Sequence, residues 1–88
     1  MDEHAAVHIA SAVVFASPDR CEDVADRIAG LPDTEIHGFQ DGKIIVVLEG
    51  ASVGAVGSRL TTIAGMDGVL SATLVYERIA SLEELGDS

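Results

Sequence analysis

Positive charge and aromatic rings are both scarce in this 88-residue chain. Five Lys and Arg residues stand against 15 Asp and Glu residues, so the formal net charge is −10. Proteins hold nucleic-acid phosphates with Lys and Arg, and they stack bases on aromatic rings. The only aromatic residues are Phe15, Phe39 and Tyr76. Nucleic acid is therefore not an expected partner, and the charge favours a cationic partner over an anionic membrane surface.

Cysteine is also scarce, since Cys21 stands alone. A single cysteine excludes an intramolecular disulfide and any two-cysteine metal or redox motif. The longest uncharged stretch, 4–18, is shorter than the roughly 18–20 residues of a membrane-spanning helix. Asp2 and Glu3 stand where a secretory signal peptide would carry positive charge. We expect a soluble, cytoplasmic protein.

Sets of residues with catalytic or metal-binding spacing are missing as well. His4 and His8 are four apart, but they fall in a chain end and a strand, and a zinc site needs three or four ligands. His37 stands alone, and the glycines of 50–57 lack the spacing of a phosphate-binding loop. We expect neither an enzyme nor a cofactor or metal site.

Apolar residues, in contrast, make up 48% of the chain, which predicts a folded domain despite the charge. Six segments follow one another, and the residues outside them read as tails at 1–6 and 80–88. The expected domain is 7–79. Its predicted segments are a strand at 7–15, a helix at 18–29, strands at 34–39 and 43–49, a helix at 53–64 and a strand at 69–77.

Capping and turn residues support these boundaries. Ser17 and Ser52 are the expected N-caps of the two helices, and Pro18 suits a first helical position. Asp41-Gly42 predicts a type I′ hairpin turn between the second and third strands. The expected apolar helix faces are Cys21, Val24, Ala25, Ile28 and Leu31 in the first helix, and Val53, Val56, Leu60 and Ile63 in the second.

This order of elements predicts an α+β fold, the ferredoxin-like βαββαβ sandwich. Its four-stranded antiparallel sheet has the order 4-1-3-2 and carries both helices on one face. An internal repeat agrees with two βαβ halves, because Ser17 and Ser52 lie 35 positions apart, as do Gly30 and Gly65. The other face of the sheet is then left open.

Strand alternation predicts which side chains lie on this open face. In the last strand we place Leu70, Ala72 and Leu74 toward the helices and Val69 away from them; in the second strand we place His37 and Phe39 outward. Carboxylates at the strand ends form an expected acidic rim of Glu35, Glu49 and Glu77. The predicted centre of the face is apolar or small: Ile9, Ser11, Val13, Ile45, Val47, Ser71, Thr73 and Val75.

An exposed apolar patch of this kind usually marks an interaction site. An amphipathic helix with basic residues would match both the centre and the acidic rim. Homodimerisation through the sheet, or plain tolerance of apolar surface, are the alternatives at this point.

Three segments carry a resemblance to a known family: HIASAVVFASPDR at 8–20, DGKIIVVLEG at 41–50 and GVLSATLVYE at 68–77. With them the chain resembles the NapD family, the maturation chaperones of the periplasmic nitrate reductase. The resemblance implies binding of the twin-arginine signal peptide of the catalytic subunit, NapA, as a helix on the open sheet. Binding would delay export by the Tat translocase until the molybdenum cofactor and iron–sulfur cluster are in place. Phe15 departs from the expected polar side chain near the end of the first strand.

Two other classes of protein share this topology. An ACT-like module would bind small molecules, but the turn at 15–19 lacks the extra glycines that favour it. An acylphosphatase-like enzyme needs an Asn to position water, and the chain contains no Asn. The signal-peptide chaperone is therefore the preferred hypothesis, with the ACT-like module as its alternative.

Overall fold

The structure is a computed structural model and describes residues 6–81. The predicted tails at 1–6 and 80–88 lie largely outside these residues. The last strand continues to Ser81, four residues beyond its predicted end. The elements are β1 (Ala6–Ala16), a 3-10 turn η1 (Pro18–Arg20), α1 (Cys21–Ala29), β2 (Thr34–Gln40), β3 (Lys43–Gly50), α2 (Val53–Ala64) and β4 (Val69–Ser81).

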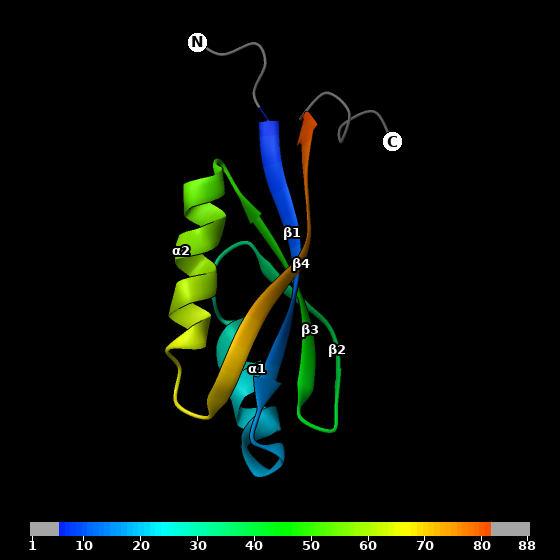
Figure 1. Ribbon diagram of the computed structural model, residues 1–88, viewed down its shortest axis with the longest axis vertical. Helices are drawn as coiled ribbons and strands as arrows, with labels where there is room; N and C mark the ends of the chain where they lie inside the picture. Colours follow the sequence, from blue (N-terminus) through cyan, green and yellow to red (C-terminus); the bar gives the residue numbers. More distant parts are fainter. Residues whose placement is uncertain (1–5, 82–88) are drawn as a thin grey trace.

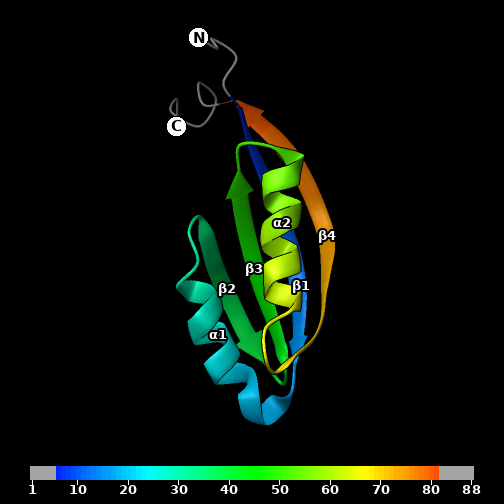
Figure 2. The same ribbon diagram turned by 90° about the vertical axis from the view of Figure 1, so that its left-hand side faces the viewer.

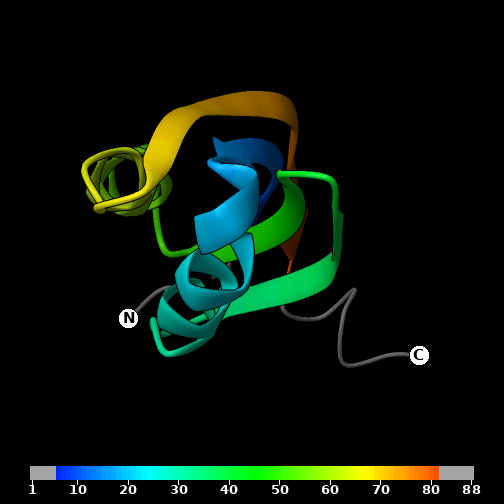
Figure 3. The ribbon, with the colours of Figure 1, turned by 90° about the horizontal axis from the view of Figure 1, so that it is seen from below.

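The four strands form one antiparallel sheet in the order β2-β3-β1-β4, which is the predicted order. Both helices lie on the same side of this sheet, with α1 beside β2 and α2 over the side of β4 (Figures 1 and 2). Seen from below, no helix of the described residues covers the opposite side (Figure 3). The ferredoxin-like sandwich with one open face is thus confirmed.

The first helix begins later than predicted. Pro18–Arg20 forms a 3-10 turn, in which the backbone carbonyl of Ser17 accepts a 2.8 Å hydrogen bond from the Arg20 amide. The Ser17 side chain makes no capping bond, so its predicted role as N-cap is wrong. The apolar face is as expected, since Cys21, Val24, Ala25 and Ile28 are buried.

The second helix begins with the predicted cap. The Ser52 hydroxyl accepts a 3.1 Å hydrogen bond from the Ala55 amide, which satisfies one of the free N–H groups of the first turn. Val56 and Ile63 are buried against the sheet. Val53, however, is 58% exposed, so the buried face starts one turn later than predicted.

The turn between β2 and β3 explains how the hairpin is attached to β1. Asp41 and Gly42 both have positive φ, 54° and 82°, as a type I′ turn requires. The Gly42 carbonyl accepts a 2.8 Å hydrogen bond from the Ala16 amide. A Cβ at position 42 would lie 2.8 Å from the Ala16 carbonyl oxygen, so this position requires glycine for space as well as for φ.

The hydrophobic core lies between the two helices and the two central strands. Small residues of β1 leave room for the larger side chains that come from β3 and the helices. The fully buried members are Ala10, Ala12 and Val14 of β1, Ile44, Val46 and Leu48 of β3, and Val24, Ile28 and Ile63 of the helices. One side of β1 and β3 is therefore committed to the core, which turns their alternate residues toward the open face.

Candidate functional site

The open face is most regular where β1 and β3 meet. Their register is continuous over eight residue pairs, from His8–Gly50 to Phe15–Lys43. Directly opposite residues of an antiparallel pair point to the same side. The outward pairs are Ile9–Glu49, Ser11–Val47, Val13–Ile45 and Phe15–Lys43. The residues predicted for these two strands therefore do lie together on the open face, with Ile45 40% exposed at its centre.

The register between β1 and β4 is shifted in the middle of β4. Ala12 lies opposite Leu74 and Ser11 opposite Tyr76, so no residue of β1 lies directly opposite Val75. One extra residue turns every later side chain to the other face. Glu77 consequently lies opposite Ala10, a buried residue on the helix side.

This shift corrects one predicted site residue. Glu77 does not belong to the acidic rim, whereas Val75 is the extra residue of the bulge and is 58% exposed between Leu74 and Tyr76. Tyr76, opposite Ser11, and Arg78, opposite Ile9, also lie on the open face. The adjacent apolar residues Leu74 and Val75, which break the alternation, were the available signal for a bulge.

A second shift lies at the beginning of β4. Val69 lies opposite Ala16 and packs against the core, whereas Leu70 has no opposite residue and is 69% exposed. The predicted sides of these two residues are therefore reversed. Ser71 and Thr73 still lie on the open face, opposite Phe15 and Val13.

The edge strand β2 carries a similar irregularity. Glu35 lies opposite Val47 on the open face, and its carboxylate is 3.3 Å from Nε2 of His37. The register then skips one residue, so that Gly38 lies opposite Ile45 and Phe39 opposite Ile44. Phe39 therefore lies on the helix side, contrary to the prediction.

Gly38 leaves a hollow in the open face that the sequence did not reveal. A Cβ at this position would meet no atom within 4 Å. The hollow measures about 550 Å³, and its lining residues on the open face are Gly38, Gln40, Lys43 and Ile45. Its other two lining residues are Asp41 of the hairpin turn and Phe39, which lies on the other side of the edge strand β2. A glycine inside a strand often marks a bulge or the close approach of another molecule, and that was the available signal.

Charges on the open face lie at its ends. Glu35 and Glu49 are neighbours at one corner, because Glu35 lies opposite Val47 and Glu49 follows Val47 by two residues on β3. Lys43 lies at the other end of β3, opposite Phe15, and Arg78 lies across Ile9 from Glu49. Two of the three predicted rim carboxylates are thus in place, and the centre is uncharged.

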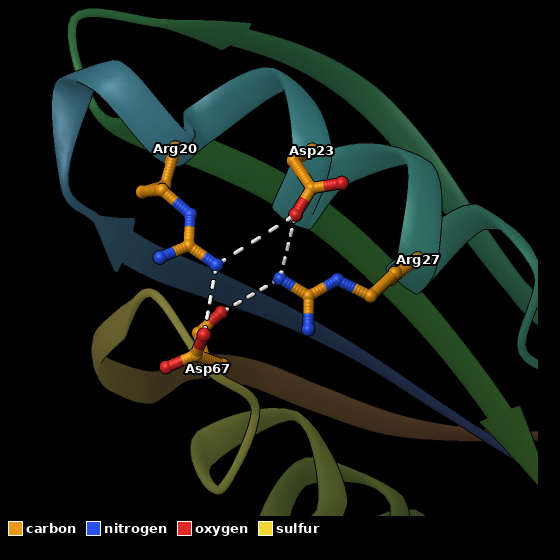
Figure 4. A network of polar contacts seen from close by, with 4 residues as sticks. All are labelled: Arg20, Asp23, Arg27 and Asp67. Carbon is orange, nitrogen blue, oxygen red and sulfur yellow. Dashed lines mark hydrogen bonds and ion pairs between the residues drawn. The ribbon is translucent and has the colours of Figure 1, made fainter.

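A separate group of charges joins α1 to the loop before β4 (Figure 4). Arg20 donates a 2.8 Å hydrogen bond to the Asp67 carboxylate, and Arg27 donates one of 2.8 Å to the Asp67 carbonyl. Arg27 also bonds Asp23 at 2.9 Å. The hydrogen bond and the positive charge of Arg20 lower the pKa of Asp67, and the hydrogen bond and the negative charge of Asp67 raise the pKa of Arg20. This group positions the start of β4.

Within 6–81 no three His, Cys, Asp or Glu side chains are placed to hold a metal ion. Over the same range, no helix has the length and apolar character needed to cross a membrane. Cys21 is buried in the core.

Comparisons with known proteins agree with this geometry. A family model described as NapD protein matches residues 7–81. Chaperone NapD of Paracoccus pantotrophus is 50% identical over 78 residues, which cover 89% of this chain and 70% of that protein. The solution structure of the E. coli Tat proofreading chaperone protein NapD superposes with a TM-score of 0.78 at 26% identity, covering 85% of this chain and 81% of that one. The chain therefore belongs to the NapD family, and both of these relatives are chaperones.

Proposed function

We propose that this chaperone binds the twin-arginine signal peptide of NapA, the catalytic subunit of the periplasmic nitrate reductase. The peptide binds as a helix on the open face in the cytoplasm, and binding delays export until the cofactors of NapA are inserted. The observation that carries the proposal is a sheet face that no described element covers and whose centre is apolar. The E. coli relative, a Tat proofreading chaperone, supports the same assignment.

The centre of the face suits the apolar part of such a peptide. An amphipathic helix can pack on the shallow, uncharged surface formed by Val13, Ile45 and Val47. Ordering a disordered peptide costs about 2–5 kcal/mol. Burial of a few hundred Å² of apolar surface, at about 25 cal/mol per Å², offsets this cost.

The charge of the face suits the basic part of the peptide. Glu35 and Glu49 lie on the open face, and the whole chain carries a formal charge of −10. Complementary charge raises the association rate and selects against wrong partners. A peptide that is basic and then apolar matches both properties of the face.

Titration calorimetry with a synthetic peptide of the cognate NapA signal sequence tests the proposal. We expect saturable binding to the native chain. Thr73→Arg places a charge opposite Val13 in the apolar centre, so we expect its affinity to fall at least about tenfold. Thr61→Arg is the matched control, because Thr61 is exposed on α2, on the helix side, and its replacement should leave affinity unchanged.

Circular dichroism confirms that each variant is folded. Absence of binding by the folded native chain would refute the proposed function. Equal losses in the two threonine variants would show that the peptide binds somewhere other than the open face.

A further inference from the structure

We propose that the peptide lies along β2 and β3 in one direction, with its arginine pair at the Glu35–Glu49 corner and an apolar side chain in the hollow over Gly38. This inference rests on the proposed function and adds the direction of the bound peptide to it. Two independent features of the open face carry it, one at each end of the same two strands.

The first feature is the distribution of charge. Within the described residues, the Glu35–Glu49 corner is the place on the open face where two carboxylates lie together. At the opposite end, Lys43 and Asp41 place one charge of each sign beside the hollow. Arg78 also lies near the Glu49 end, but it is on β4, across β1 from Glu49. The guanidinium groups are therefore attracted to the β2–β3 side, where Glu35 and Glu49 lie.

The second feature is the shape of the surface. Most outward side chains of β1 and β3 fill the space above their strands, whereas Gly38 leaves the space above β2 empty. Ile45 lies opposite Gly38 and forms an exposed apolar wall. Large side chains that enter such hollows contribute most of the binding energy in many interfaces. The apolar segment of the peptide is the part that can supply one.

The distance between the two features sets a spacing in the peptide. Glu49 is four residues from Ile45 along β3, which is about 13 Å at 3.3 Å per residue. Glu35 lies opposite Val47 and Gly38 opposite Ile45, so the two are separated by only two residues of β3, about 7 Å by the same rise. A helix advances 1.5 Å per residue, so the side chain in the hollow follows the arginine pair by roughly four to nine residues.

Paramagnetic relaxation in NMR spectra measures the direction. Two versions of the synthetic NapA signal peptide carry a nitroxide, one immediately before the arginine pair and one about ten residues after it. We expect the first label to broaden the amide signals of Glu35 and Glu49 most strongly. The second label should broaden those of Gly38, Gly42 and Lys43 instead.

The outcomes separate this inference from the proposed function. If saturating peptide broadens no signal on any face, both are wrong. If the first label broadens Gly42 and Lys43 more than Glu49, the peptide binds the open face in the opposite direction and only this inference is wrong.

Variants provide a second readout. Glu49→Lys should weaken binding on the order of tenfold. Glu77→Lys is the matched control, because Glu77 lies on the helix side, and it should change affinity less than twofold. Replacing each apolar peptide residue by alanine should give the largest loss of affinity at one position, roughly four to nine residues after the arginine pair. A maximum outside that window would contradict the inferred anchor.

Discussion

The two neighbours of β1 differ in how they pair with it. β3 pairs with β1 without interruption, and its alternate residues Ile44, Val46 and Leu48 are fully buried. β4 pairs with the same strand through two register shifts, and Leu70 and Leu74 on it remain 69% and 41% exposed. The same strand thus has one neighbour that belongs to the core and one that is largely surface.

The difference shows when alternation can be used to assign faces. A continuous register keeps every second side chain on one side of the sheet. The side on which one residue of β3 lies therefore determines the side of every other residue in that strand. Each extra residue in β4 reverses the assignment beyond it. Exposed apolar residues of β4 also contribute little to the core, and Tyr76 among them is 57% exposed on the open face.

The largest expected effect is a difference in stability between a variant of β3 and a variant of β4. Ile44→Ala on β3 should lower the free energy of unfolding by about 2–4 kcal/mol, because it leaves a cavity among fully buried residues. Leu74→Ala on β4 should lower it by less than about 1.5 kcal/mol, since the side chain is already 41% exposed. Urea unfolding followed by circular dichroism measures both. Equal losses would mean that β4 is as much a part of the core as β3.

A smaller effect tests the shifted register directly. Tyr76→Ala should weaken binding of the NapA signal peptide about three- to thirtyfold, because the ring lies on the open face opposite Ser11. Glu77→Ala should change affinity less than twofold, because that residue lies opposite Ala10 on the helix side. Calorimetry on the two folded variants decides between registers. The reverse order of effects would indicate that β4 alternates without the bulge at Val75.

The smallest effect concerns the ion pair that holds the start of β4. Arg20 keeps the pKa of Asp67 below its ordinary value, so the folded state binds this proton less readily than the unfolded state does. The resulting stabilisation is present above the unfolded pKa and is lost as the pH falls through the folded pKa. The side chains of Arg20 and Asp67 are 41% and 79% exposed, so the contribution to stability is small and sensitive to salt.

Asp67→Asn tests this ion pair. The variant should be slightly less stable than the native chain at pH 6, and the difference should vanish near pH 2. Asp26→Asn on the exposed side of α1 serves as the control and should show no such convergence. A difference that persists at pH 2 would assign the effect to something other than the carboxylate charge.

Much of the fold was predictable from local signals. Asp41-Gly42 identified the hairpin, Ser52 identified the start of α2, and the spacing of Val24, Ala25 and Ile28 identified the buried face of α1. These features depend on residues within one turn or one helix. Ser17 failed as a cap because the 3-10 turn at Pro18–Arg20 precedes the α-helix, and both conformations suit the same residues.

The candidate site was only partly predictable, because it depends on the pairing of strands and not on local signals alone. Ile9, Ser11, Val13, Ile45 and Val47 were placed correctly because β1 and β3 pair without interruption. Glu77 was placed wrongly, and Tyr76, Arg78 and the hollow over Gly38 were missed, because the register of an edge strand depends on the strand beside it. A residue of β4 can be identified as extra only from the pairing of β4 with β1.

The scarcity of basic and aromatic residues, the order of elements and the presence of an apolar open face were determined by the sequence alone, since composition and short-range periodicity are properties of the chain itself. The tertiary structure decided which side chains of β2 and β4 belong to that face. Backbone hydrogen bonds between strands distant in sequence set the register, and one extra residue in β4 moves Glu77 off the open face and brings Tyr76 and Arg78 onto it.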